Sequence, residues 1–596
     1  MKRLKLLFLF PIFFLFSCGK LTFYTDQVVI IQNPDLPTTL EVFSELPDLT
    51  KYIKISVLDE EIEVSDDLII YNNIDMNVIG KYTVKYAYVY DGKTYQKNLL
   101  FKILDTTKPE IKQINMDTNL VDASLPDFTK YIEVIDNYDG KIALNESSYS
   151  ITNYLPYQDS SFIVTYQVSD SSGNKNTYSI PFNITYPNGY YISENFNGIE
   201  KVDSDAIKSS GDVKVLVIPI DFNSSPSTDL DDQVIKKSFF DKKSDNYLSL
   251  YEYYYRSSYF KLELTGEVLS WQRAKFEPSY YENYKNAQTG LKGDAILIQE
   301  AVEGLNKKSL NLDDYDKDNN GYIDAVYFLY NHDYNKDSNI YWAYKYWYYG
   351  DLSLGNKKIG SYVFASVNFL EDDIKIGYSR TLIHETGHLL GLDDYYDYNI
   401  GVGPEGGLGK ADMMDYNAGD HNPFSKLLLN WVKPIVVARN VASKQGFELE
   451  IKSFSEYNTD NVVIIPAGNN SDLLFNEFFI IIYYTPTNLN STQYYLRDSG
   501  ILIYHVISYI GEGGSGGKYR SSFQFDNSDT DYKLIRIYEA DQNDSIETTG
   551  SISKDDLLVR NQSVKLISYT GKIIAQVENK SSIFNRDNAK IKITIY

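Results

Sequence analysis

The run from His384 to Asp394 constrains this chain most, because it reads H-E-x-x-H-x-x-G-x-x-D. Positions four apart share one face of a helix, so His384 and His388 are predicted to point the same way and to bind one zinc ion. Glu385 lies beside them, where a general base for a water at the metal is needed. Gly391 tolerates the left-handed backbone that ends a helix, and the chain can then return Asp394 as a third ligand. Three protein ligands are typical of a catalytic zinc site.

The same run would also fit an ordinary amphipathic helix with two incidental histidines. Against this alternative, the chain has only five histidines, and two of them flank a glutamate here. Downstream, the stretch 411–417 fits the methionine-bearing turn that lies under zinc sites of this type, and Met414 is expected to pack there without proton chemistry. Tyr416 follows two residues later. It is either a donor to the transition state or a packing tyrosine.

Three stretches together resemble the immune inhibitor A family of secreted zinc metalloproteases: 384–397, Asp412–Met414 and 423–431. This family is metzincin-type, with aspartate as its third zinc ligand. The resemblance covers roughly residue 213 to the end of the chain. It implies an α+β zinc protease domain and a zinc-dependent endopeptidase that hydrolyses peptide bonds.

A second metal site is predicted upstream, in the run 316–324. Acidic or amide side chains occupy loop positions 1, 3, 5 and 9, with glycine at position 6, as at the start of a calcium loop. The residues that would contribute to it are Asp316, Asp318, Asn320, Tyr322 and Asp324. Position 12 is Tyr327 instead of the glutamate of a full EF-hand, so we expect a partial loop with a structural Ca²⁺. The alternative is a solvated acidic turn.

Several elements around these motifs are predicted from apolar patterns. Residues 213–222 and 325–330 are expected to form buried strands, and residues 294–305 a helix. Residues 358–367 alternate as an edge strand does. From its position before the histidine motif, we expect this strand to lie above the zinc and to pair with substrate.

The first 18 residues are predicted to be an export signal, with a basic start and an apolar run too short to span a membrane. The signal ends in a stretch that resembles a bacterial lipoprotein cleavage box. Cys18 is the only cysteine in the chain. We expect it to be lipid-modified and to anchor the protein at the outer face of the cell membrane. The alternative is a signal-peptide cysteine without a role.

An internal repeat follows the signal. Leu46–Ile53 recurs as Leu125–Ile132, and Tyr82–Tyr86 is echoed by Phe162–Tyr166. These segments alternate apolar and polar residues between turn signals, which predicts two all-β immunoglobulin-like sandwiches. We interpret them as a stalk in preference to a ligand-binding region.

The sequence therefore predicts a multidomain protein. Its expected parts are a lipoprotein signal peptide (1–18), a tether (19–27), immunoglobulin-like modules (28–106 and 107–187), a zinc metalloprotease domain (188–435) and a β-rich C-terminal domain (436–596). The net charge of −24 argues against nucleic acid as a partner. The expected partners are protein or peptide substrates, with the membrane reached through the lipid anchor. We expect a monomer.

The predicted function is hydrolysis of extracellular proteins at the bacterial cell surface. The competing hypothesis is a surface adhesin or binding lipoprotein whose protease domain is inactive. A decayed site usually loses its glutamate or a ligand first, and Glu385, His384, His388 and Asp394 are all present.

Overall fold

The computed structural model describes most of the chain after residue 26. Within 27–596 it leaves out 122–124, 156, 187–188, 194–195, 197, 199–202, 204, 244–246, 287–289, 306–311, 377–378, 439–445, 457–460, 470–471, 512–521 and 582–586. The predicted export signal and Cys18 lie outside the described residues. Within the described part, no helix is both long enough and apolar enough to cross a membrane.

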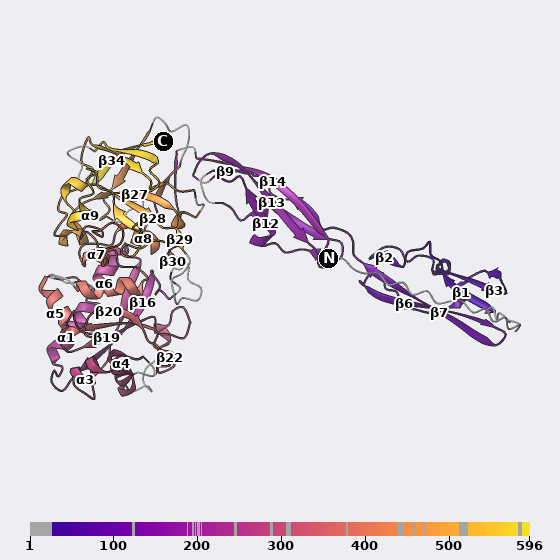
Figure 1. Cartoon of the computed structure of the whole chain (residues 1–596), viewed down its shortest axis with the longest axis horizontal. Helices are drawn as coiled ribbons and strands as arrows, with labels where there is room; N and C mark the ends of the chain where they lie inside the picture. Colours follow the sequence, from indigo (N-terminus) through magenta and orange to yellow (C-terminus); the bar gives the residue numbers. More distant parts are fainter. Residues whose placement is uncertain are drawn as a thin grey trace, which may run out of the picture. The chain divides into compact units, whose positions relative to one another are not determined.

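The chain is a multidomain, β-rich protein with several separate sheets and comparatively few helices in its described part (Figure 1). It forms two compact units. The first comprises the described residues up to Asp117 together with those of Asp127–Thr152 and Val164–Ile180. The second comprises Thr118–Pro126, Asn153–Ile163 and Pro181–Tyr596. This division passes through the second repeat, and the domain boundaries expected from the sequence stay a prediction.

The two repeats have the same strand order, with one three-stranded and one four-stranded sheet each. The two sheets of the first repeat have the strand orders β1-β3-β4 and β2-β7-β6-β5. Their strands are β1 Val28–Gln32, β2 Thr39–Glu41, β3 Ile53–Val57, β4 Glu60–Ile62, β5 Ile69–Asn72, β6 Gly80–Tyr90 and β7 Lys93–Leu104. The two sheets of the second repeat have the strand orders β11-β10-β8 and β12-β13-β14-β9. Their strands are β8 Glu110–Gln113, β9 Asn119–Val121, β10 Ile132–Asp136, β11 Gly140–Lys141, β12 Tyr149–Thr152, β13 Ser160–Ser169 and β14 Lys175–Thr185. In both, the short outer strand β2 or β9 runs parallel to its neighbour.

A buried tyrosine explains part of the repeated sequence. The Tyr86 hydroxyl donates to the carbonyl oxygen of Leu49 at 2.9 Å, and the Tyr166 hydroxyl donates to that of Phe128 at 2.9 Å. Both tyrosines are fully buried. Each bond fastens a short 3-10 turn to the long strand beneath it, so the repeated residues specify the same local structure twice.

Replacing Tyr166 by Phe should therefore weaken the second repeat. The Phe128 carbonyl would be left buried without its donor, which costs about 1–3 kcal/mol. Tyr178→Phe is the matched control, because Tyr178 is 37% exposed and its hydroxyl is 3.4 Å from Gln113 Oε1. Hydrogen exchange with peptide resolution should show faster local opening for Tyr166→Phe only. Equal exchange in both variants would contradict this account.

The second unit contains a mostly parallel sheet in the order β17-β16-β19-β23-β20, with β18 paired to β16. Its strands are β16 Gly211–Asp221, β17 Leu262–Val268, β18 Gln272–Arg273, β19 Ala325–Tyr330, β20 Tyr344–Trp347 and β23 Ser361–Ser366. The helices around it are α1 Asp229–Phe240, α2 Leu250–Ser257, α3 Pro278–Asn283, α4 Gly293–Gly304, α5 Val367–Ile376 and α6 Arg380–Leu389. The predicted strands at 213–222 and 325–330 and the helix at 294–305 are confirmed as β16, β19 and α4.

Alternating residues of β16 explain why both faces of this sheet are covered. Val215 and Val217 belong to the apolar core that includes residues of α1, α2 and α6. Leu216 and Ile218 belong to a separate core that includes residues of α4. A strand buried on both faces reads as a continuous apolar run, as this one does.

The prediction that residues 358–367 form an edge strand was wrong about the position of the strand in its sheet. Residues 361–366 form β23, which lies inside the sheet between β19 and β20. The edge is β20, which runs antiparallel to β23. Val363, Phe364 and Ala365 are all fully buried, because neighbours cover both faces of β23. The apparent alternation of this segment did not reflect one exposed face.

The C-terminal part of the second unit contains two further sheets, ordered β15-β24-β26-β27-β28-β31 and β25-β34-β33-β32. Their strands are β15 Tyr190–Ile192, β24 Ile435–Val437, β25 Phe447–Lys452, β26 Val463–Pro466, β27 Glu477–Tyr484, β28 Gly500–Ile507, β31 Ile535–Ile537, β32 Ser563–Ile567, β33 Ile573–Asn579 and β34 Asn588–Ile595. The remaining elements are β21 Ser353–Leu354, β22 Lys357–Lys358, β29 Ile510–Gly511, β30 Ser522–Phe523, α7 Met413–Tyr416, α8 Pro423–Leu428 and α9 Ile546–Thr549.

Strands β27 and β28 are buried at every position. On one face, Ile480 and Leu502 join the core that also contains α6. On the other, Ile481 and Ile503 join the core shared with β25 and β32–β34. Figure 1 shows this layering, with α6, α7 and α8 between the β16–β19 sheet and the β27–β28 sheet.

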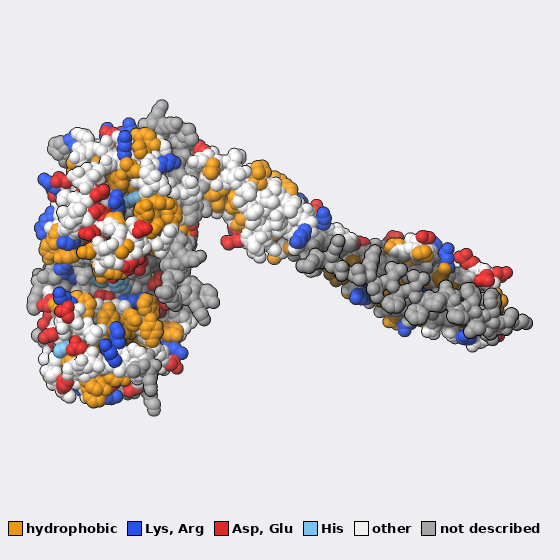
Figure 2. Space-filling view, in the orientation of Figure 1, with side chains coloured by type: hydrophobic (Ala, Val, Ile, Leu, Met, Phe, Trp, Pro, Cys, Tyr) orange, Lys and Arg blue, Asp and Glu red, His pale blue; other side chains and the backbone are white. Residues whose placement is uncertain are grey.

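On the face shown in Figure 2, basic side chains are interspersed with acidic and apolar ones and do not gather into a patch.

Candidate metal centre

Helix α6 carries the histidine motif and ends where the sequence predicts. Gly391 has a φ of +86°, the left-handed conformation expected of it. The N–H of Gly391 donates to the carbonyl of His388 at 3.1 Å, and the N–H of Leu392 donates to that of Gly387 at 3.0 Å. These bonds close the helix end and turn the chain back, which brings Asp394 to the histidine face.

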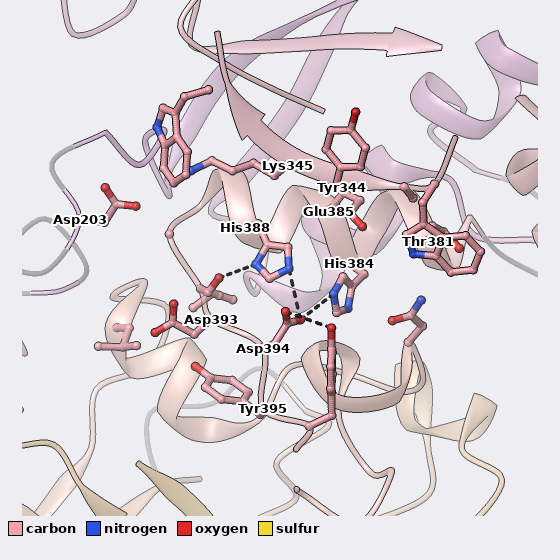
Figure 3. Close-up of a pocket in the computed structure, with 18 of the residues that line it drawn as sticks. Asp203, Tyr344, Lys345, Thr381, His384, Glu385, His388, Asp393, Asp394 and Tyr395 are labelled. Atoms are coloured by element: carbon pink, nitrogen blue, oxygen red, sulfur yellow. Dashed lines mark hydrogen bonds and ion pairs between the residues drawn. The ribbon is translucent and has the colours of Figure 1, made fainter. Parts of the chain in front are cut away.

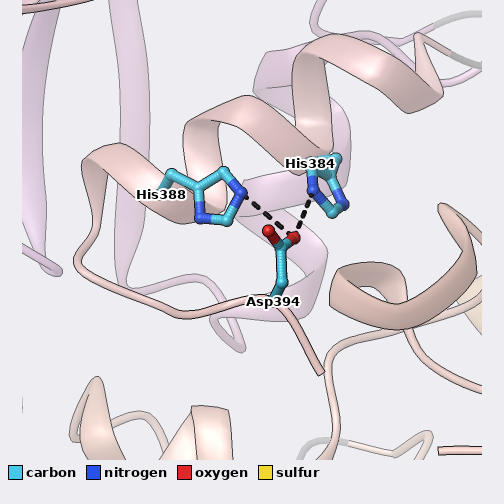
Figure 4. A group of neighbouring side chains, drawn as sticks. All are labelled: His384, His388 and Asp394. Carbon is cyan, nitrogen blue, oxygen red and sulfur yellow. Dashed lines mark ion pairs between the residues drawn. The ribbon is translucent and has the colours of Figure 1, made fainter. Parts of the chain in front are cut away.

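His384, His388 and Asp394 converge on one point (Figure 4). The distance from Asp394 Oδ1 to Nε2 is 3.0 Å for His384 and 3.3 Å for His388. His384 is buried, and the other two residues are half-buried. The three residues that the sequence predicts as ligands are thus side by side.

The other ring nitrogen of each histidine has a backbone partner. Nδ1 of His384 is 3.1 Å from the Met413 carbonyl oxygen, and Nδ1 of His388 is 2.8 Å from that of Leu392. A carbonyl only accepts, so in the neutral imidazole Nδ1 carries the hydrogen and Nε2 presents a lone pair to the site. Asp394 Oδ1 is buried and receives no hydrogen bond. Two nitrogen lone pairs and one orphaned carboxylate oxygen fit a divalent metal such as zinc.

Glu385 lines the same cavity, whose volume is about 690 Å³ (Figure 3). Its side chain is buried, and the backbone N–H of Lys345 on β20 donates to its carboxylate. Burial raises the pKa of Glu385, while His388 and His384 partly oppose the rise. A carboxyl with a raised pKa, held at the wall of the cavity, suits a group that takes and returns a proton.

Met414 lies against α6 at Gly387. It is fully buried on α7, and Asp412 Oδ1 caps that helix by accepting from the Met414 N–H at 2.8 Å. A Cβ atom added to Gly387 would lie 2.4 Å from Met414 Sδ. Glycine therefore permits the close approach that also lets the Met413 carbonyl reach His384.

Gly387→Ala should destabilise this part of the protein. Overpacking of a filled site costs about 1–3 kcal/mol, which exceeds the ~1 kcal/mol gained in helix propensity. Gly401→Ala is the control, because its added Cβ would meet only Asn399 Oδ1 at 3.7 Å. Thermal unfolding should show a lower Tm for Gly387→Ala alone. An unchanged or higher Tm would mean that Met414 does not pack tightly against α6.

Aromatic residues that the sequence analysis did not single out form one wall of the cavity. They come from β20 and the residues before it: Trp342, Tyr344 and Trp347. Trp342 is 42% exposed. The signal for this wall was present in the aromatic run 341–349. This run did not stand out because tyrosine is frequent throughout the chain.

A different tyrosine from the expected one contacts the predicted ligands. The Tyr396 hydroxyl donates to Asp394 Oδ2 at 3.2 Å. Tyr416 lines a neighbouring hollow with Arg380 and Tyr495, and its ring is 5.7 Å from that of Tyr495. A catalytic role for Tyr416 stays a prediction.

The upstream acidic loop brings Asp316, Asp318 and Asp324 together, with one oxygen of each within 4.8 Å of the others. Gly321 has a φ of +88°, as the sharp turn of such a loop requires. Lys357 Nζ is 2.7 Å from Asp316 Oδ2 and already balances part of the negative charge. Calcium binding by this loop stays a prediction.

Metal binding by the histidine cluster can be tested through its carboxylate. Asp394→Ala should lower zinc affinity by more than about 100-fold, since even changes outside the ligand set cost about 10–100-fold. Asp393→Ala is the matched control, because Asp393 lines the same cavity but is not part of the cluster. Competition titration with a chromogenic chelator measures both. If Asp393→Ala lost zinc and Asp394→Ala kept it, the ligand set would be wrong.

Comparison with known proteins gives little beyond this geometry. No protein-family model matches the chain, and no curated protein matches it. Among solved structures, the chain is similar to the M60 catalytic domain with two CBM51 domains of ZmpB from Clostridium perfringens, at 11% identity and a TM-score of 0.17. That match covers 29% of this chain and 32% of the other, so it spans about a third of that neighbour's length. A lipoprotein from Bacteroides thetaiotaomicron matches at 14% identity and a TM-score of 0.12, over 26% of this chain and 98% of its own.

Proposed function

We propose that this chain is a zinc-dependent endopeptidase that hydrolyses extracellular proteins. The observation that carries the proposal is the convergence of His384 Nε2, His388 Nε2 and Asp394 Oδ1, with Glu385 at the wall of the same cavity. The resemblance to the immune inhibitor A family, with a metzincin-like domain over about 188–435, is part of this proposal.

His384, His388 and Asp394 would hold the zinc ion. When bound, zinc would supply a Lewis acid for the peptide carbonyl and the attacking water. Glu385 would take the proton from that water as its oxygen adds to the carbonyl carbon. The same carboxyl would then give the proton to the leaving amine nitrogen as the C–N bond breaks, so that one proton is removed and returned.

The substrate would lie along β20. This strand is the edge of its sheet, and its backbone touches Glu385 through Lys345. An extended peptide could therefore add to the sheet with its carbonyl near the proposed base. The exposed ring of Trp342 and the neighbouring Tyr344 and Trp347 would offer apolar surface to substrate side chains. These contacts support a peptide substrate.

The rest of the chain would serve this activity from the cell surface. In the proposal, Cys18 carries the lipid anchor and the two repeats are immunoglobulin-like modules that form a stalk. The expected calcium at Asp316–Asp324 would stiffen the loop before β19.

The central residue of the proposal is Glu385. Glu385→Gln should bind zinc as the unaltered chain does but lose at least about 100-fold in kcat, because general acid–base catalysis contributes about 10²–10⁴-fold. Glu303→Gln is the control, since Glu303 is exposed on α4 and outside the cavity. Casein hydrolysis by residues 19–596, with and without 1,10-phenanthroline, measures activity, and elemental analysis measures zinc.

The outcomes separate the hypotheses. Activity lost in Glu385→Gln and with the chelator, but kept in Glu303→Gln, is the expected result. Full activity of Glu385→Gln would refute the assignment of the base. Absence of both zinc and activity in the unaltered chain would favour the adhesin.

A further inference from the structure

Three buried aspartates meet at the second repeat, and none of them belongs to the site described above. Asp105, Asp136 and Asp170 are only 5%, 3% and 7% exposed. They come from separate segments: Asp105 follows β7, Asp136 ends β10 and Asp170 follows β13. One carboxylate oxygen of each lies within 4.8 Å of the other two. The fold therefore gathers three acidic groups from distant positions in the sequence.

Local hydrogen bonds leave part of this cluster without partners. Oδ1 of Asp105 accepts from the Thr107 N–H at 3.1 Å, and Oδ1 of Asp136 accepts from the Tyr138 N–H at 2.8 Å. The remaining oxygens, Asp105 Oδ2 and Asp136 Oδ2, are buried and receive no hydrogen bond. Burying a carboxylate oxygen without a hydrogen-bond donor is unfavourable in free energy, so two such oxygens indicate that a ligand binds here.

Electrostatics point to a cation. Burial raises the pKa of Asp105, and the neighbouring Asp136 and Asp170 raise it further, against the opposing hydrogen bonds from the Thr107 N–H and the Ser172 side chain. Among the described residues, no lysine or arginine forms an ion pair with any of the three aspartates. Like charges held together in a buried site are unfavourable unless an opposite charge joins them.

The first repeat shows that the fold does not require two of these acids, Asp136 and Asp170. Val57 ends β3 as Asp136 ends β10. Tyr90 lies four residues after the buried Tyr86, as Asp170 lies four residues after Tyr166. Valine and tyrosine therefore occupy the corresponding positions of the first repeat, and Asp136 and Asp170 have no acidic counterpart there.

We propose that Asp105, Asp136 and Asp170 bind a calcium ion. All three donors are carboxylates, and hard oxygen donors favour calcium over zinc. Calcium–oxygen distances are about 2.3–2.6 Å, so two ligands of one ion lie no more than about 5 Å apart. The 4.8 Å limit within the cluster meets this condition.

The ion would tie the segment after β7 to the second repeat. The carbonyl oxygen of Asp105 already accepts from Asn174 Nδ2 at 3.1 Å, and that of Pro109 accepts from Asn176 Nδ2 at 2.8 Å. Asn174 also bonds to Asp170 through its side chain, at 2.9 Å. Calcium would add ionic contacts to these hydrogen bonds, so that the segment 105–109 becomes rigid when the ion binds.

Calcium titration of residues 19–596 tests this site. Asp136→Asn keeps the shape of the side chain but removes a ligand charge, and it should bind one calcium fewer per chain than the unaltered protein by isothermal titration calorimetry. Asp170→Asn should lose the same single site. Asp318→Asn, in the acidic loop before β19, should leave this site intact. Asp91→Asn, in the exposed turn between β6 and β7, is the surface control.

The sign of the stability change distinguishes a metal ligand from a merely structural aspartate. In EGTA, Asp136→Asn should unfold at the same temperature as the unaltered chain or higher, because one of three repelling charges is gone. With calcium the order should reverse. If Asp136→Asn and Asp170→Asn kept the calcium stoichiometry and the calcium-dependent shift in Tm of the unaltered chain, the proposal would be overturned.

Discussion

The candidate centre depends on two hydrogen bonds from imidazole to backbone. His384 Nδ1 and His388 Nδ1 bond to the carbonyls of Met413 and Leu392, which directs both Nε2 lone pairs to the point where Asp394 Oδ1 lies without a donor. Each carbonyl is set by its own local structure: the turn at Gly391 positions Leu392, and the capped helix α7 positions Met413. The metal centre is therefore a product of backbone geometry as much as of ligand identity.

The same principle links the two proposed cation sites. In each, oxygen or nitrogen atoms that can bind a metal converge on one point, and hydrogen bonds to the surrounding backbone fix their directions. Such arrangements are unfavourable in isolation and become favourable when a cation supplies the missing charge. In the acidic loop before β19, Lys357 supplies part of that charge already, so its need for a metal is smaller.

The sequence predicted the parts of the site that are close in the chain. Helix α6, the left-handed Gly391 and the return of Asp394 all follow from spacing within a dozen residues. The sequence did not predict the features that depend on contacts between segments far apart in the chain. The edge position of β20 follows from pairing with β23, and no local pattern encodes it. Likewise, the burial of both faces of β27 depends on packing against a second sheet, β25-β34-β33-β32, which no pattern within β27 itself encodes.

X-ray absorption at the zinc edge tests the central claim most directly, because it reports the atoms around the metal. For residues 19–596 purified without added chelator, this account predicts one zinc per chain, with two imidazole nitrogens and otherwise oxygen ligands. The imidazole signal should be lost in the double variant His384→Ala, His388→Ala. A chain without zinc, or zinc whose imidazole signal survives in that variant, would contradict the account.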